Sequence, residues 1–343
     1  MEYGGLYSNR GSISSANETA LFRFRQNPLT GTGKDDMTHS MKKPITLAHS
    51  PDSDDAFMFY GLAKGKVETG GLRFKHILRD IETLNRAAEL GTYDITAISF
   101  HAYPYVQNNY RLMTCGSSIG DRYGPMIVAK RRLSRQSLRG KTIAIPGTMT
   151  TAYLALRLFL DDFLPKVVPF DRIPDAVRRG EADAGLLIHE GQLTYGKIGL
   201  HKIVDLGEWW WQKTRLPLPL GGNAIHRRFA DADARRLEQI VKESILHGLA
   251  HRDEALRHAM TFSRGMTTRL SDKFVGMYVN DYTVDMGPKV KKAIALLLDL
   301  GWREGIIPCR TRPEFVRLSP RKPKKPNSCA VGDGERSSRE GKD

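Results

Sequence analysis

Short apolar runs alternate with amphipathic segments through the first two thirds of this chain. A buried strand of a parallel sheet reads as a brief apolar run, and the crossover that follows it reads as a helix, so this alternation predicts strands joined by helices. Strands are expected at residues 45–49, 72–78, 93–99, 141–147 and 184–189. Helices are expected at residues 53–65, 80–91, 150–163 and 172–182. The pattern therefore predicts an α/β fold with parallel sheets covered by helices on both faces.

The last third of the chain has a different pattern, because residues 232–300 are almost wholly helical in their spacing. Within this stretch Pro288 suits the first turn of a helix and Gly301 suits its end. Four apolar side chains recur at helical spacing and share one face of that helix: Val290, Ile294, Leu297 and Leu298. We expect this stripe to be buried.

The two ends of the chain lack apolar periodicity and are rich in small, polar or basic residues, so both are expected to be disordered. Between them we expect two α/β domains with a cleft, and crossings between the domains near 131–140 and 216–224, where Pro, Gly and polar residues suit hinges. The predicted divisions are an N-terminal extension (1–42), a first α/β domain with the C-terminal helices (43–135 and 225–316), a second α/β domain (136–224) and a basic tail (317–343).

The 343 residues carry a formal net charge of +15, which raises the question of a nucleic-acid partner. Much of the densest positive charge lies in the tail segment RLSPRKPKKP (317–326), and no recognition motif accompanies it. The body mixes both signs, as solvated helix faces do. We therefore expect no nucleic-acid partner, and a basic body that favours a small anionic ligand.

No run of about 18 apolar residues is present, so no membrane-spanning helix is expected. The N-terminus lacks the charged start and apolar core of an export signal. Cys115, Cys309 and Cys329 are odd in number and widely scattered, which fits neither a disulfide framework nor a zinc site and suits a reducing compartment. These features predict a cytoplasmic protein, which we expect to be a monomer or a homodimer.

Polar residues follow four of the predicted strands at the point where each one ends. In open parallel sheets, ligands bind beyond the carboxyl ends of the strands, where loops and helix N-termini converge. The four groups are His49 to Asp55, Ser99 to His101, Gly147 to Ala152, and His189 with Glu190. The sequence therefore predicts one ligand site at this edge of the sheets.

The third group lies where a helix is expected to begin, near Ala152. The first N–H groups of a helix have no intrahelical partner and carry partial positive charge, so they can hold a carboxylate or phosphate. Thr150 and Thr151 add hydroxyl donors. A threonine that only caps the helix explains the same residues, and the two interpretations are compatible.

The first group contains Asp52, Asp54 and Asp55 in a predicted first helical turn, where the helix dipole favours acidic residues. Asp52 or Ser53 is expected to be the N-cap. No histidine or further carboxylate stands at ligand spacing, so no metal site is expected. In the second group Ser99 and His101 lack the G-x-S-x-G context of a serine hydrolase.

His189 is the strongest candidate for chemistry, because imidazole titrates near neutrality and can take a proton from a substrate and return it. Glu190 is its neighbour in sequence, but adjacent strand residues point to opposite faces, which argues against direct pairing. A histidine that is only hydrogen-bonded at a strand end remains the alternative interpretation.

Three consecutive tryptophans, Trp209, Trp210 and Trp211, cannot share one face of a helix. At least one is expected to pack in the core and another to lie near the cleft. Aromatic packing is the ordinary role for such side chains, and stacking on a flat substrate is the alternative.

Several segments, taken in order and spacing, carry a resemblance to a known family: SPDSDDAFMFYGL, IETLNRAAELG, PGTMTTAYLAL, GLLIHEGQLTYGKIGLHKIVDLGEWWWQKTRLPLPLG and YVNDYTVDMG. They resemble the 1,4-dihydroxy-6-naphthoate synthase family of the futalosine route to menaquinone. The resemblance covers about residues 45–316. It implies two α/β domains of the type II periplasmic-binding-protein-like fold around a central cleft.

The resemblance also implies an activity: a lyase without cofactor that cleaves cyclic dehypoxanthinylfutalosine to 1,4-dihydroxy-6-naphthoate and dihydroxyacetone. The proton acceptor of the family is the histidine of its Ile-His-Glu segment, which matches His189. The family's substrate contacts match Ala97, Ile98, Ser99, Thr151 and Ala152. The expected ligand is thus a small anionic aromatic molecule.

One segment departs from the family pattern, which reads SPCPNDTF where this chain has SPDSDDAF (50–57). Asp55 is retained, while Asp52 and Asp54 add negative charge. The departure leaves open a sister activity of the same fold, such as a chorismate dehydratase. A solute-binding protein is an alternative of another class, although such proteins need an export signal.

Overall fold

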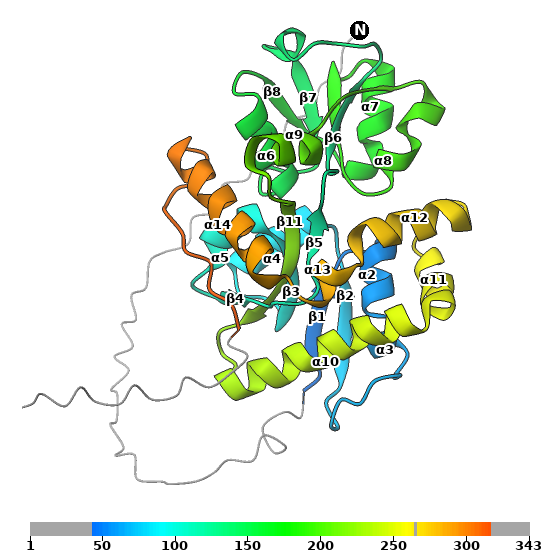
Figure 1. Cartoon of the computed structure of the whole chain (residues 1–343), viewed down its shortest axis with the longest axis vertical. Helices are drawn as coiled ribbons and strands as arrows, with labels where there is room; N and C mark the ends of the chain where they lie inside the picture. The colour runs from blue at the N-terminus through cyan, green and yellow to red at the C-terminus, as the bar shows by residue number, and fades with distance from the viewer. Residues whose placement is uncertain (1–42, 264–265, 317–343) are drawn as a thin grey trace, which may run out of the picture. The chain divides into compact units, whose positions relative to one another are not determined.

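The computed structural model describes residues 43–263 and 266–316, so the predicted tails at 1–42 and 317–343 lie outside the described residues. Two sheets carry the strands, and helices pack around both (Figure 1). The strands are β1 (Ile45–His49), β2 (Phe74–Leu78), β3 (Ile95–Ser99), β4 (Tyr110–Leu112), β5 (Ser118–Gly120), β6 (Met126–Ala129), β7 (Thr142–Ile145), β8 (Leu164–Val167), β9 (Ala184–Leu187), β10 (His201–Asp205) and β11 (Leu218–His226).

The α-helices include all of the segments that the pattern predicted to be helical, with the first one split in two at Phe59. They are α2 (Ser53–Met58), α3 (Tyr60–Ala63), α4 (Ile81–Glu89), α5 (Tyr103–Val106), α6 (Thr151–Phe159), α7 (Ile173–Arg179), α8 (Gly191–Thr194), α9 (Leu206–Thr214), α10 (Asp231–Ala250), α11 (Arg252–Met260), α12 (Thr268–Tyr278), α13 (Asp281–Val284) and α14 (Gly287–Arg303).

The first sheet has the order β2-β1-β3-β11-β4, with β5 also paired to β11. Strand β1 runs parallel to both β2 and β3. Strand β11 runs antiparallel to β3, β4 and β5. The carboxyl ends of β1 and β3 therefore lie at the same edge of this sheet.

The second sheet has the order β10-β6-β9-β7-β8. Strand β7 is parallel to β8 and β9, whereas β6 is antiparallel to β9 and β10. The chain thus passes from the first sheet to the second between β5 and β6, and returns between β10 and β11. The predicted domain bounds, with the second domain at 136–224, stay a prediction. The sheets divide the chain a little earlier: β6 lies before residue 136 but pairs in the second sheet, and β11 begins before residue 225 but pairs in the first.

The α/β class is confirmed, and the five predicted strands are parallel to one another wherever they pair. Both sheets are nevertheless mixed, because β6, β10 and β11, which the pattern did not predict, form antiparallel pairs. The reversal in the first sheet comes from β11, which covers a stretch that the sequence predicted to be an interdomain crossing. Pro219, Gly221 and Gly222 suggested a hinge there, yet Gly221 and Gly222 pair with Ser99 and Ile98 of β3. A local pattern reports a buried strand but not the direction of the strand beside it.

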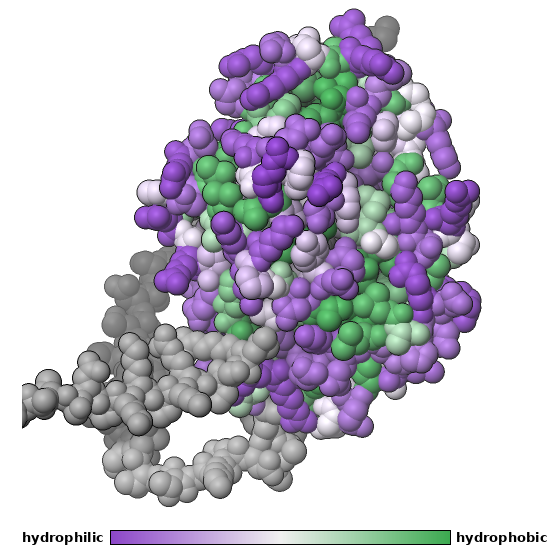
Figure 2. Space-filling view, viewed as in Figure 1, coloured by the Kyte–Doolittle hydropathy of each residue, from purple (hydrophilic) through white to green (hydrophobic). Residues whose placement is uncertain are grey.

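The core confirms the stripe on the last helix, since Val290, Ile294, Leu297 and Leu298 are all fully buried on α14. Pro288 lies in the first turn of this helix as predicted, while the helix continues past Gly301 to Arg303. Hydrophilic residues cover most of the face in Figure 2, with apolar residues gathered in patches between them. Within the described residues, no helix combines the length and apolar character that a membrane span requires.

Candidate active site

A pocket with an empty volume of about 740 Å³, its mouth included, is lined by residues at or just beyond the strand ends of both sheets. Ser50 follows β1, Ser99 ends β3, Thr150 follows β7 and His189 follows β9. The four strand ends that the sequence singled out therefore meet at one pocket.

All six residues that the sequence analysis named as catalytic or substrate-binding line this pocket. Their presence in one cavity is a finding of the structure, whereas their roles stay predictions. The six are Ala97, Ile98, Ser99, Thr151, Ala152 and His189.

The start of α6 is built as the sequence predicted. The side chain of Thr150 is the N-cap, since its hydroxyl oxygen accepts a hydrogen bond of 3.2 Å from the N–H of Tyr153. The hydroxyl of Thr151 accepts a hydrogen bond from the N–H of His101. Thr151 and Ala152, the first two residues of α6, line the pocket, and the N–H groups of a helix's first turn have no intrahelical partner.

The end of β3 is held in place by Asn85 of α4. The backbone N–H of Ser99 donates to Asn85 Oδ1 at 2.8 Å, and Asn85 Nδ2 donates to Ser99 Oγ at 3.1 Å. His101 does not line the pocket; its Nδ1 lies 3.1 Å from the carbonyl oxygen of Thr150. Burial lowers the pKa of His101 to about 4, so this histidine is neutral at physiological pH.

His189 lies two residues beyond β9, which ends at Leu187 rather than at residue 189 as predicted. Its backbone φ is +54°, a left-handed conformation that costs a non-glycine residue roughly 1 kcal/mol. The ring of Phe170 meets the imidazole edge-on, with 4.7 Å between ring centroids. Strained backbone of this kind is concentrated at functional sites, which agrees with a functional role for His189.

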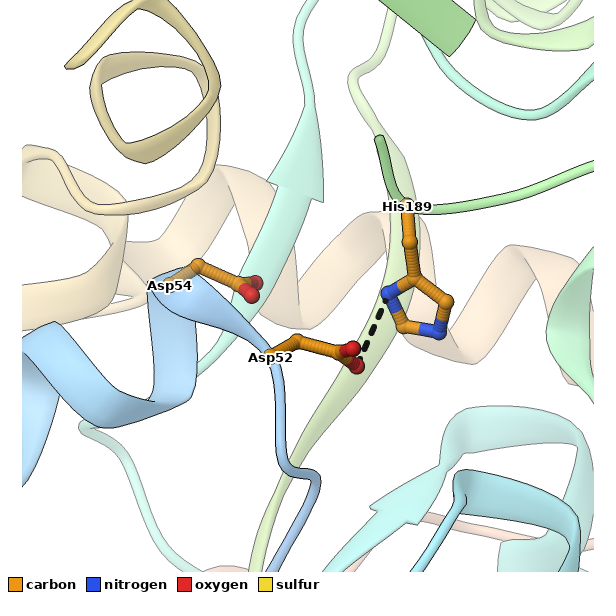
Figure 3. A group of neighbouring side chains, drawn as sticks. All are labelled: Asp52, Asp54 and His189. Carbon is orange, nitrogen blue, oxygen red and sulfur yellow. Dashed lines mark ion pairs between the residues drawn. The ribbon is translucent and has the colours of Figure 1, made fainter. Parts of the chain in front are cut away.

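Asp52 lies directly beside His189, as Figure 3 shows: Nδ1 of the imidazole is 3.1 Å from Oδ2 of the carboxylate. Asp52 is fully buried, and the hydroxyl of Ser50 donates a hydrogen bond to the same oxygen. The expectation that Asp52 or Ser53 is the N-cap accounts for the position of Asp52 but not for its contact with His189. Asp52 occupies the N-cap position of α2, but its side chain makes no capping hydrogen bond.

Two further carboxyl groups lie in the same pocket wall, on the first turn of α2. Burial, and then the carboxylates of Asp55 and Asp52, hold the pKa of Asp54 well above its usual range. Burial, and then Asp52, raise the pKa of Asp55 to about 7, although the N–H of Ser50 donates to Asp55 Oδ2 at 2.7 Å. The pocket thus combines a histidine with carboxyl groups whose environments oppose the loss of their protons.

One ligand atom each from Asp52, Asp54 and His189 lies within 4.8 Å of the other two. Two carboxylates and an imidazole can hold a divalent cation, so the sequence argument that no histidine stands near these acids was incomplete. Asp52 and His189 already contact each other, so two of the three groups have a partner without a metal ion. The expectation of no metal stays a prediction.

A hydrogen bond between two other residues of the pocket lining joins helices α8 and α12. Tyr278 of α12 donates a hydrogen bond of 2.8 Å from its hydroxyl to Gln192 Oε1 on α8. The tryptophans of α9 do not line the pocket, and the expectation that one lies near the cleft stays a prediction. Trp210 is buried in the core and its Nε1 donates to the carbonyl of Pro217.

Solved structures identify the fold. The chain is similar to the alkanesulfonate-binding protein SsuA of Xanthomonas axonopodis, with a TM-score of 0.61 at 14% identity, over 79% of this chain and 96% of that one. It is also similar to a protein of Archaeoglobus fulgidus, with a TM-score of 0.75 at 46% identity, over 78% of this chain and 100% of that one. The molecule is therefore a periplasmic-binding-protein-like fold whose pocket carries a histidine next to a buried carboxylate.

Sequence comparison gives the family: residues 45–302 match the menaquinone biosynthesis family model, and the chain belongs to that family. A 1,4-dihydroxy-6-naphthoate synthase of Thermus thermophilus is 38% identical over 79% of this chain and 99% of its own length. The synthase of the same name from Streptomyces coelicolor is 35% identical over 77% of this chain and 95% of its own length. The resemblance seen in the sequence is confirmed, and the chain is an enzyme of menaquinone biosynthesis.

Proposed function

We propose that this enzyme cleaves cyclic dehypoxanthinylfutalosine to 1,4-dihydroxy-6-naphthoate and dihydroxyacetone, with His189 as general base. The observation that carries the proposal is the position of His189 in the pocket lining, with its Nε2 atom making no hydrogen bond within the described residues. A ring nitrogen without a partner in a ligand pocket can accept a proton from the substrate.

In the proposed reaction Nε2 of His189 removes the proton of a substrate hydroxyl group. The oxygen left behind forms a carbonyl as the adjacent carbon–carbon bond breaks, and this carbonyl belongs to the dihydroxyacetone product. The electron pair of the broken bond enters the ring and reaches the ring ketone, whose oxygen takes up a proton as the naphthoate becomes aromatic. The step needs no oxidant, because the substrate only divides into two products.

The substrate carboxylate is proposed to lie at the start of α6, against the N–H groups of Thr151 and Ala152. A helix N-terminus stabilises negative charge, and this one opens at the pocket wall. Ala97, Ile98 and Ser99 would line the opposite side of the aromatic ring. A cytoplasmic location and a monomeric or homodimeric state belong to the same proposal.

The test is turnover of cyclic dehypoxanthinylfutalosine by the purified protein, followed by absorbance and mass of the naphthoate. We expect His189→Ala to lower turnover at least about 10²-fold, the usual minimum contribution of a general base. His251→Ala is the matched control, because His251 is an exposed histidine outside the pocket lining. Binding of the substrate without product in the wild type would instead favour a binding protein, and product at a near-normal rate from folded His189→Ala would remove His189 as the base.

A further inference from the structure

We propose that Asp52 is the positioning residue of His189: its carboxylate accepts a hydrogen bond from Nδ1–H, which fixes the tautomer and presents the Nε2 lone pair to the pocket. The inference rests on the proposed function, in which His189 is the base. It adds a residue at a position where the family pattern has no carboxylate, since Asp52 stands at the cysteine of SPCPNDTF.

The geometry fixes which nitrogen faces which group. Nδ1 is 3.1 Å from Asp52 Oδ2, a hydrogen-bonding distance. Nε2 lies on the other side of the ring, as Figure 3 shows, and makes no hydrogen bond within the described residues. An ionised carboxylate can only accept, so Nδ1 must carry the hydrogen of the neutral ring. Nε2 is then the unprotonated nitrogen.

Asp52 is itself held in one orientation. The hydroxyl of Ser50 donates to the oxygen that faces His189, and the carboxylate has no exposed surface. It also stands at the N-cap of α2 without capping it. An acidic residue at that position ordinarily bonds the N–H groups of the first turn. Because the Asp52 side chain points toward His189, it gives up the capping hydrogen bond to its own helix and makes a contact with a distant segment of the chain.

The same carboxylate also stabilises the product of proton transfer. When Nε2 takes a proton, the imidazole becomes a cation in a site that excludes most water, since His189 is only 17% exposed. A carboxylate at this distance lowers the free energy of that cation, as the aspartate does in a Ser-His-Asp triad. Asp54 is near the pair but is not placed for this role, because burial and its neighbours oppose its ionisation.

Asp52→Asn is the decisive variant, because the asparagine amide can donate to Nδ1 and so favour the wrong tautomer, with hydrogen on Nε2. We expect kcat to fall by about 10²–10⁴-fold, where the upper value is the loss seen when the aspartate of a Ser-His-Asp triad is exchanged for asparagine. KM should change by less than about threefold, because Asp52 acts through His189 rather than on the substrate. Asp52→Glu should recover part of the lost kcat.

Asp205→Asn is the matched control. Asp205 is also buried and caps α9 through its contacts with the N–H groups of Gly207 and Glu208, outside the pocket lining. Asparagine caps as well as aspartate, so this variant tests the general cost of replacing a buried carboxylate. We expect it to retain kcat within about twofold of the wild type.

A second measurement needs no turnover. In protein labelled with ¹⁵N at histidine, the ring nitrogens of His189, assigned by their loss in His189→Gln, should show hydrogen on Nδ1 in the wild type. Hydrogen on Nε2 in the wild type, or a folded Asp52→Asn with kcat within about threefold of the wild type, would overturn the inference. If Asp52→Asn does not fold, Asp52→Glu and the wild-type spectrum decide. Absence of naphthoate formation by the wild type would end the proposed function, while the spectrum would still decide the pairing.

Discussion

Replacing Asp55 by asparagine should make the protein more stable above neutral pH. Asp55 is 8% exposed, and burial followed by the carboxylate of Asp52 raises its pKa to about 7. The N–H of Ser50 donates to Asp55 Oδ2 at 2.7 Å, and an asparagine side-chain oxygen can accept the same hydrogen bond. Asp55→Asn therefore removes the charge and keeps the contact.

The size of the effect follows from the two pKa values. The carboxyl group has an ordinary pKa of 3.8 and a folded pKa of about 7. Between these values the unfolded chain has released the proton while the folded chain keeps it, so the free energy of unfolding falls as pH rises through this window. A difference of about three pKa units corresponds to at most about 4 kcal/mol, reached in full above pH 7.

Urea unfolding of the wild type and Asp55→Asn at pH 4, 6 and 8 measures this directly. We expect nearly equal stability at pH 4, and a gain of about 2–4 kcal/mol for Asp55→Asn at pH 8. Asp161→Asn is the control, since its side chain is 77% exposed, and it should show no such dependence on pH. A gain that is the same at all three pH values, or a loss at pH 8, would refute this account of Asp55.

Two further changes test the packing and the acid response of the fold. Gly207→Ala should destabilise the protein by about 3 kcal/mol or more in urea unfolding, because a Cβ there would lie 1.9 Å from the backbone oxygen of Tyr123. Gly196→Ala, with open space around it, should leave stability nearly unchanged. An equal loss of stability in the two variants would contradict this. His101 has a folded pKa of about 4, so it lowers stability as pH falls from 6.5 to 4, and His101→Gln should remove up to about 3 kcal/mol of that loss. An unchanged loss in His101→Gln would show that His101 is not the cause.

Much of the fold could be predicted from local pattern, and the parts that could not depend on long-range pairing. Residues 45–49 were predicted as a strand and form β1. The stripe on α14 was predicted from spacing alone and is fully buried. By contrast, the direction of β11 depends on its neighbours β3 and β4, which lie more than 90 residues earlier and leave no trace in the local sequence.

The candidate site shows the same division. The strand ends that line the pocket could be predicted, because a polar group after a buried strand is visible in the sequence. The contact of Asp52 with His189 could not, because a helix-capping role already accounted for Asp52 and 137 positions separate the two residues. The signal that could have found it was the departure from the family pattern at residue 52. A buried carboxylate is unfavourable without a partner of opposite charge or a hydrogen-bond donor, and His189 was the titratable group already predicted for that pocket.

The three acidic residues at the N-cap and first turn of α2 are not one uniform negative patch. Asp52 receives the hydroxyl hydrogen bond of Ser50 and faces His189, while Asp55 receives one backbone N–H and Asp54 Oδ1 receives no hydrogen bond within the described residues. The same exchange of aspartate for asparagine should therefore have a favourable effect on stability at one position and an unfavourable effect on turnover at another, three residues away. Asparagine at 55 should stabilise the fold above pH 7, because it removes a charge that the site opposes. Asparagine at 52 should reduce turnover, because it removes a charge that His189 needs.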